Sequence, residues 1–256
     1  MTEPLRIAWL TTGRGEGSFG GLEHTLNAIA GGLPVEIAVL FVNRDRGEAE
    51  PTDRLIAMAE ERGVPVETLS SVRFRKERGG ERSKPGEPLP AWRHEFDADV
   101  AQRLDSYGFE LGVMFGYMLI ATPELHLRHP FINDHPALPD GPVGTWQQVI
   151  VELIHSHAAE SGCLMHLVTE DLDRGPVVSY CRYRIADACD QRSRDAAAST
   201  EDPTGTSLFA EIRRRGVARE RPFLVETLGA IAAGSLQLPP RTPLDLTTAV
   251  ETAVAG

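Results

Sequence analysis

The sequence predicts an α/β protein in which helices cover both faces of a mostly parallel, Rossmann-like sheet, giving three layers. Short, mostly apolar runs recur along the first half of the chain, as is typical of strands buried on both faces of a sheet. Helical patterns separate these runs, and alternating strands and helices build parallel sheets with right-handed crossovers. The predicted strands of this half are residues 6–11, 35–42, 64–69 and 111–115.

Composition and charge argue against several classes of protein. The chain has 256 residues and a net charge of −11, from 26 basic and 37 acidic residues, which disfavours a general binder of nucleic acid or anionic membranes. No apolar run approaches the length of a membrane span, and the first residues lack the pattern of a signal peptide. Three cysteines without a Cys-x-x-Cys pair imply neither a disulfide framework nor a zinc finger. We expect a cytoplasmic protein without a metal site, and we leave a homodimer open.

A glycine-rich segment follows the first strand. Residues 12–21 read Thr-Gly-Arg-Gly-Glu-Gly-Ser-Phe-Gly-Gly, and a helix is expected over 22–30. A loop between a strand and a helix can bind a phosphate through its backbone N–H groups and the helix N-terminus. Neither the dinucleotide nor the Walker pattern fits this loop, so a flexible crossover is an equally good interpretation.

The middle of the chain departs from the alternation of strands and helices. After a helix over 53–62 and the third strand, residues 72–95 combine many basic residues with several glycines and prolines. Such a long loop is either a functional lid or a mobile surface. A basic lid in an acidic protein would suit an anionic ligand, but a solvated loop is the favoured interpretation. A helix is expected next, over 96–107.

The segment around Asn133 and His135 carries the most specific chemical pattern. The apolar strand 111–115 and a short helix over 123–129 precede it. Asn133 and His135 are two residues apart on an extended strand, so their side chains point to the same face, and Pro136 favours the extended backbone of His135. An amide and an imidazole at a strand end suit a ligand site in an open α/β sheet. The alternative is a polar strand end followed by a proline-rich turn.

Two further strands are expected after a helix that runs from residue 146 to about residue 160. They cover 161–168 and 176–185 and flank a loop that contains Asp173. His166, just before this loop, is either a core histidine or part of a site near the strand end.

The last part of the chain is predicted to be helical and peripheral. Residues 186–207 are rich in Ala, Asp, Ser and Thr, which predicts a linker. Two helices over 208–215 and 222–233 follow, each stopped by a glycine, and the proline-rich tail is expected to be loosely attached. We therefore expect one domain over 1–185, on which the linker and C-terminal helices of 186–256 pack.

Three segments resemble the motifs of folate-dependent formyltransferases, in the order that this family shows. Residues 133–139, Asn-Asp-His-Pro-Ala-Leu-Pro, are similar to its Asn-x-His-Pro-Ser-Leu-Leu-Pro signature. Residues 166–176 resemble its His-Phe-Val-x-x-x-Leu-Asp-x-Gly-Pro segment, and Gly-Tyr-Met at 116–118 resembles its Gly-Phe-Met. The likeness runs from Arg6 to about Arg184 and is greatest to the glycinamide ribonucleotide formyltransferase branch.

This resemblance implies the formyltransferase fold, a catalytic domain over 1–185, and the roles of several residues. The catalytic residues would be Asn133, His135 and Asp173. The pterin ring of the folate would lie in a pocket at the end of the fourth strand, where Leu119 replaces the arginine that the family usually has. The residues implied for folate binding are Tyr117, Met118, Leu119, Ile120, Thr169, Glu170 and Asp171.

The acceptor side of the expected site departs from the family. The family binds its substrate phosphate with Gly-x-Gly-Ser-Asn, whereas Phe19 follows Ser18 here and no asparagine is present. The family's Glu-His motif before a Tyr-Pro is also absent, and Glu220 is only a candidate in that neighbourhood. We therefore expect an acceptor other than the usual ribonucleotide. The residues expected to contact it are Gly13, Gly15, Gly17, Ser18 and Glu220.

The resemblance implies transfer of a formyl group from 10-formyltetrahydrofolate to the amine of a small molecule, with no metal. Asn133 and protonated His135 would stabilise a tetrahedral oxyanion, and Asp173 would stabilise the imidazolium. Two alternatives remain: a 10-formyltetrahydrofolate hydrolase that uses the same residues on water, and a non-catalytic folate-binding protein. A donor at another oxidation level, such as the methylene folate, also stays open.

Overall fold

The structure is a computed structural model that describes residues 3–84 and 86–255. The contacts between residues divide the chain into two compact units, and each unit combines segments that are distant in sequence. The first unit consists of residues 1–133 and 167–175, and the second of residues 134–166 and 176–256.

The first unit contains a parallel sheet. Its strands are β1 (Leu5–Thr11), β2 (Val35–Val42), β3 (Val66–Thr68), β4 (Leu111–Met114) and β5 (Phe131–His135), the last of which runs on into the second unit. They lie in the order β3-β2-β1-β4-β5, and each is parallel to its neighbour. A parallel sheet presents the carboxyl ends of its strands along one edge, where ligands usually bind.

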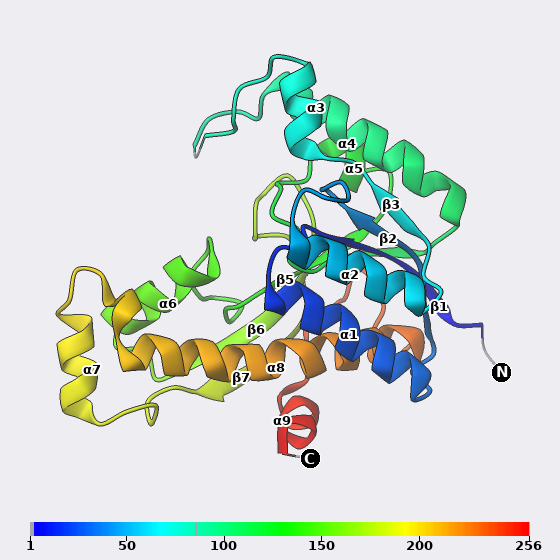
Figure 1. Cartoon of the computed structure of the whole chain (residues 1–256). Coiled ribbons are helices and arrows are strands. Elements are labelled where there is room, and N and C mark those ends of the chain that lie inside the picture. The colour runs from blue at the N-terminus through cyan, green and yellow to red at the C-terminus, as the bar shows by residue number, and fades with distance from the viewer. Residues whose placement is uncertain (1–2, 85, 256) are drawn as a thin grey trace. The chain divides into compact units, whose positions relative to one another are not determined.

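Helices cover both faces of this sheet (Figure 1). They are α1 (Glu16–Ala30), α2 (Glu50–Glu61), α3 (Ser71–Glu77), α4 (Ala91–Leu104) and the short α5 (Pro123–His126). Because side chains alternate along β1, Leu10 packs in one core cluster with Phe74 of α3 and Phe96 of α4, whereas Trp9 contacts the ring of Phe115 on the other face. The three layers expected from the sequence are thus present within this unit.

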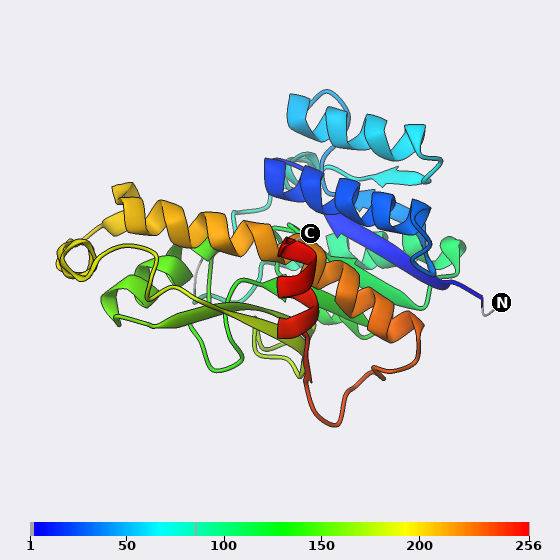
Figure 2. The same ribbon diagram turned by 90° about the horizontal axis from the view of Figure 1, so that it is seen from below.

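The second unit contains the remaining strands and helices. Strand β6 (Glu160–Leu167) pairs antiparallel with β7 (Val177–Arg184), which is parallel to the short β8 (Leu244–Asp245). A capping box between Thr145 and Gln148 starts α6 (Trp146–His155), which ends before the predicted residue 160. The other helices are α7 (Gln191–Ala198), α8 (Ser207–Ala232) and α9 (Thr247–Ala255). Figure 2 shows α9 beside α8, and the two helices are in contact.

The hydrogen-bonded strand order over the chain is β3-β2-β1-β4-β5-β6-β7-β8. Only the β6–β7 pairing is antiparallel among the pairings described. The prediction of a mostly parallel α/β sheet is therefore confirmed. Within residues 3–84 and 86–255, none of the helices combines the length and the apolar composition that crossing a membrane requires.

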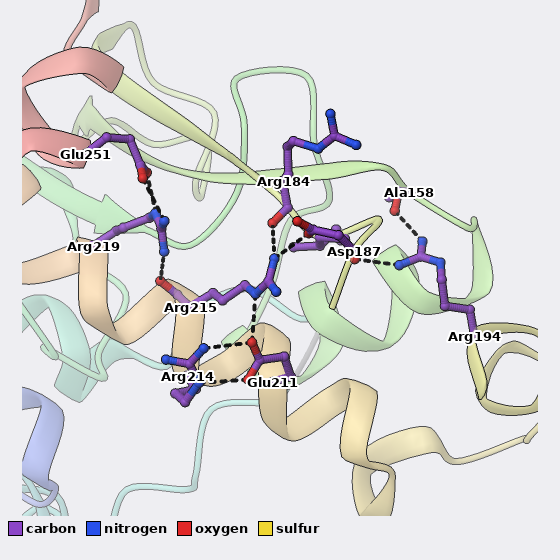
Figure 3. A network of polar contacts seen from close by, with 10 residues as sticks. Ala158, Arg184, Asp187, Arg194, Glu211, Arg214, Arg215, Arg219 and Glu251 are labelled. Carbon is purple, nitrogen blue, oxygen red and sulfur yellow. Dashed lines mark hydrogen bonds and ion pairs between the residues drawn. The ribbon is translucent and has the colours of Figure 1, made fainter. Parts of the chain in front are cut away.

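Arginine side chains join the helices of the second unit to its strands and loops (Figure 3). The buried Arg194 of α7 donates to the carbonyl oxygens of Ile185, at 2.6 Å, and Ala158, at 2.8 Å. Arg219 of α8 forms a two-pronged ion pair with Glu251 of α9, at 2.5 and 2.9 Å. Guanidinium groups suit this task because they donate several hydrogen bonds in fixed directions.

Two helices lie where the sequence predicts loops. Helix α3 falls in the predicted loop 72–95, and its N-terminus is capped by Ser70, whose hydroxyl accepts from the amide of Arg73 at 3.1 Å. Helix α7 falls in the predicted linker 186–207, where Asp190 caps it in the same way. A single capping side chain satisfies backbone N–H groups at a helix start, and composition alone does not reveal it.

The prediction for the C-terminal part of the chain is wrong in two further respects. Helix α8 is continuous through Gly216 and Pro222, where two helices were expected. A Cβ atom at residue 216 would lie 3.0 Å from the hydroxyl of Tyr183, so Gly216 allows close packing against β7 and does not end the helix. The tail is not loosely attached, because Val250 of α9 is fully buried.

Candidate active site

Strand β5 carries Asn133 and His135, whose spacing places them on one face of the strand. The His135 ring is buried, and its Nε2 atom lies 2.9 Å from the carbonyl oxygen of Pro142. A carbonyl oxygen can only accept, so Nε2 carries a proton and donates to it. The chain that follows β5 therefore fixes both the tautomer and the orientation of this ring.

Asp173, the third expected catalytic residue, lies in the loop 167–175. This loop belongs to the first unit, as does Asn133, whereas His135 belongs to the second. The convergence of the three side chains on one site stays a prediction. The φ angle of Asp173 is 55°, in the left-handed region that Asp and Asn adopt more readily than most other residues. The sequence pattern does not reveal this conformation.

Asp134, between the two expected catalytic residues of β5, is a charged residue that the sequence reasoning did not single out. Its Oδ1 atom is buried and has no hydrogen-bond partner among the residues described. Burial, reinforced by the nearby Glu220 and Cys181, raises the pKa of Asp134 well above its usual value, and Arg213 acts in the opposite direction. A carboxylate in a short strand that begins with the apolar Phe131 and Ile132 is the sequence signal that would have identified this position.

Glu220, expected to contact the acceptor, lies in α8 of the second unit. It is mostly buried, with 7% of its surface exposed, and pairs with Arg213 at 2.7 Å. The Arg213 guanidinium also lies over the ring of Trp146, 4.4 Å from its centre. Glu220 thus helps to raise the pKa of Asp134, and the arginine that pairs with Glu220 opposes that effect.

The glycine-rich loop and the expected folate segment are in contact within the first unit. The amide of Met118 donates to the Thr12 hydroxyl at 2.9 Å, and the amide of Thr12 donates to the Gly116 carbonyl at 3.0 Å. Gly116 has a φ of 69°, and a Cβ atom there would clash with the hydroxyl of Ser18. Only glycine adopts this conformation and leaves this space without strain. The segments that the sequence assigns to two different ligands are therefore neighbours.

Apolar side chains lie exposed around the expected folate segment. Met118 is 68% exposed, Ile120 is 40% exposed and Leu172 is 53% exposed. Tyr117 points instead into the core, where its ring packs edge-on against Phe41 at 6.5 Å. Exposed apolar side chains of this kind suit a flat aromatic ligand.

The remaining expected folate residues differ in exposure. Leu119 is half-buried and packs against the core cluster of the first unit. The Thr169 hydroxyl donates to the Asp171 carbonyl at 3.4 Å, and both Glu170 and Asp171 are exposed.

In the part of the chain that the structure describes, no group of three or more His, Cys, Asp or Glu side chains is placed to hold a metal ion.

The glycine-rich loop is shorter than the sequence suggests, because α1 begins at Glu16 and not at residue 22. Gly15 is the N-cap residue, and its helix has an acidic residue, Glu16, in the first turn. A carboxylate near a helix N-terminus is favourable for the helix, and it repels a second anion at the same place. Gly17 and Ser18 thus lie within α1, while Gly13 and Gly15 precede it.

Most of this chain is similar in sequence to a known family of proteins. Residues 6–208 match the family described as "Formyl transferase". Phosphoribosylglycinamide formyltransferase of Escherichia coli (strain K12) is 27% identical over 129 residues, which cover 47% of this chain and 59% of that protein. The chain thus spans about six-tenths of the length of this curated relative.

Solved structures of similar fold cover most of the chain. Glycinamide ribonucleotide transformylase 1 from Symbiobacterium toebii has a TM-score of 0.66 and 23% identity, covering 94% of this chain and 93% of that one. A formyltetrahydrofolate deformylase from Pseudomonas syringae pv. tomato str. DC3000 has a TM-score of 0.63 and 19% identity, covering 91% of this chain and 63% of that one. At these identities the likeness shows the fold alone.

Proposed function

The chain belongs to the formyl transferase family, and on this premise we propose that it transfers the formyl group of 10-formyltetrahydrofolate to the amine of a small molecule. The observation that carries this proposal is β5, which places an amide and a histidine of fixed tautomer on one strand face. The proposal places the protein in the cytoplasm, without nucleic acid or membrane as a partner.

The reaction needs hydrogen-bond donors for a developing oxyanion and a group that manages protons. The amine nitrogen attacks the formyl carbon, the carbonyl oxygen becomes an oxyanion, and the bond to N10 of the folate then breaks. The Asn133 amide donates to the oxyanion, and Nδ1 of the His135 imidazolium supplies a second N–H, because Nε2 already donates to Pro142. The Asp173 carboxylate favours this charged imidazolium and takes the amine proton through water. A proton is then returned to N10 of the folate as the bond to the formyl carbon breaks and the carbonyl re-forms.

The folate is proposed to bind in the first unit. Exposed Met118 and Ile120 offer an apolar surface to the pterin ring, and the 169–171 backbone offers polar groups to its edge. Leu119, in place of the usual arginine, makes this surface more apolar.

The acceptor is proposed to carry an amine and to lack the phosphate of glycinamide ribonucleotide. Phosphate binding at a helix N-terminus requires free N–H groups and an absence of competing negative charge. Glu16 places a carboxylate in the first turn of α1, and Phe19 stands near the position where the family has an asparagine. Gly13 and Gly15 are instead proposed to present backbone groups to a neutral or cationic amine.

Steady-state assays with 10-formyltetrahydrofolate and a panel of small amines test the proposal. We expect amine-dependent release of tetrahydrofolate with one member of the panel, and poor turnover of glycinamide ribonucleotide. Release of formate at equal rates with and without amines would identify a hydrolase instead. Failure of every reduced folate to bind at millimolar concentration would overturn the proposal.

A further inference from the structure

A buried ion pair lies on the face of α4 that packs against the first unit's core. Arg93 and Asp97 are one helical turn apart, their side chains are 1% and 0% exposed, and their charged groups approach to 3.2 Å. The guanidinium also lies near the rings of Trp92 and Phe96, at 5.2 and 5.4 Å from their centres. Neither residue belongs to the sites considered above.

The pair holds the expected folate segment at two points. The Arg93 Nη2 atom donates to the carbonyl oxygen of Ile120 at 2.6 Å. The Asp97 Oδ2 atom accepts from the amide of Thr122 at 2.7 Å. Together with the bond between Met118 and Thr12, these contacts determine the path of the backbone on which Met118 and Ile120 are displayed.

This arrangement is a poor source of stability. Arg93 Nη1 and Asp97 Oδ1 are buried without a hydrogen-bond partner in the described part of the chain, as is the hydroxyl of Tyr117 nearby. Burial raises the pKa of Asp97 above its usual value in spite of the opposing effect of Arg93. Buried ion pairs of this kind are often no more stabilising than apolar residues of similar volume, and some instead specify one conformation.

We propose that Arg93 and Asp97 are positioning residues that hold the 117–122 segment in the shape that binds folate. The proposal rests on the assignment of folate to this segment under the proposed function. The pair does not touch the reacting atoms, so its removal should weaken folate binding more than it slows the chemical step.

The same helix supplies a matched control. Asp99 and Arg103 have the same spacing on α4 and form an ion pair at 2.7 Å, but both are more than one-third exposed. Their contacts described here involve no atom of the 117–122 segment. Exposed pairs of this kind contribute little to stability.

The test compares Arg93→Met/Asp97→Leu with Asp99→Leu/Arg103→Met. Binding of 5-formyltetrahydrofolate is measured by calorimetry, kcat and KM for 10-formyltetrahydrofolate by assay, and folding by thermal melting. We expect Arg93→Met/Asp97→Leu to have a melting temperature near that of the wild type and to bind 5-formyltetrahydrofolate at least tenfold more weakly. Its KM for 10-formyltetrahydrofolate should rise by a larger factor than its kcat falls. The exposed replacement should match the wild type in all three measurements.

Arg93→Lys keeps the test decisive if the double variant does not fold. A lysine retains the charge beside Asp97, but its side chain is one bond shorter than the path to Nη2, the Arg93 atom that makes both the Ile120 contact and the ion pair, so we expect a several-fold rise in KM. Wild-type affinity in a folded double variant, or in Arg93→Lys where the double variant does not fold, would overturn this inference and leave the proposed function standing. A wild-type protein that binds no reduced folate would overturn both.

Discussion

The Nε2 atom of His135 donates a hydrogen bond to the carbonyl oxygen of Pro142, 2.9 Å away. This contact uses Nε2, and in the proposed mechanism the nitrogen that donates to the reaction is Nδ1. Proline has no backbone N–H but keeps its carbonyl group, so the backbone of Pro142 can orient the His135 ring.

Two amide replacements of His135 distinguish its nitrogens. The side-chain amide of Asn reaches the position of Nδ1, whereas that of Gln extends to the position of Nε2. We expect His135→Asn to retain more activity than His135→Gln, with the latter reduced by about 10²–10³-fold in kcat, the usual effect of losing an oxyanion donor. Steady-state kinetics with the best amine acceptor measures this order, and the reverse order would show that Nε2 acts in the reaction.

Replacing Asp173 tests the proposed role of its negative charge in the reaction. Asp173→Asn preserves the side-chain shape and tolerates the φ of 55°, so the protein should fold normally. We expect kcat to fall by about 10²–10⁴-fold because the carboxylate no longer favours the imidazolium or manages the amine proton. Asp140→Asn, at an exposed position that is assigned to neither ligand, is the control. Equal kcat values for the two variants would remove Asp173 from the mechanism.

The left-handed backbone at Gly116 predicts a local stability effect. Gly116→Ala introduces both backbone strain and a clash with Ser18, and we expect a loss of about 1–3 kcal/mol in the free energy of unfolding. Gly79→Ala shares the positive φ but places its Cβ atom in open space, so it should lose less. Denaturant unfolding of the two variants measures the difference.

Asp134 predicts a pH dependence of stability. Its folded-state pKa lies above the unfolded value of 3.8, so its favourable contribution is complete below that value and is lost as pH rises through the folded pKa. Asp134→Asn cannot ionise, and its melting temperature should gain on that of the wild type as pH rises from about 4. The exposed Asp140→Asn should show no such trend. A constant difference across pH would mean that the pKa of Asp134 is the same in the folded and the unfolded protein.

Replacing the buried Arg194 should reduce stability more than replacing the exposed Arg192 of the same helix. Arg194→Lys cannot donate to both the Ile185 and Ala158 carbonyls, so one of them loses its partner, at a cost of about 1–3 kcal/mol. Arg192→Lys changes an exposed side chain of the same helix and should be nearly neutral. Thermal melts of the two variants provide the comparison.

The sequence predicted the parallel strands well because each is a short apolar run that the two helical layers must bury. It also predicted that Asn133 and His135 share an extended strand, because their spacing and the neighbouring proline are local properties. The partners of buried charges were not predictable in this way. Glu220 acts on the pKa of Asp134, and Arg93 reaches the Ile120 carbonyl, only after distant segments have packed together.

Local patterns misled where tertiary packing overrides propensity. Gly216 and Pro222 favour an interruption, yet α8 runs through both, since packing against β7 compensates for weak intrinsic helicity. The capped helices α3 and α7 show the opposite case, in which one side chain starts a helix in a polar segment.

Gly216 has a consequence for protein engineering. Glycine-to-alanine replacement inside a helix ordinarily increases thermal stability by about 1 kcal/mol, and residue 216 is an obvious target for such a screen. Here the added methyl group would meet the Tyr183 hydroxyl at 3.0 Å, so the helix must shift away from its strand or the tyrosine must move. The gain in helix propensity at residue 216 is therefore opposed by this displacement, and a library that varies Gly216 and Tyr183 together would relieve the contact.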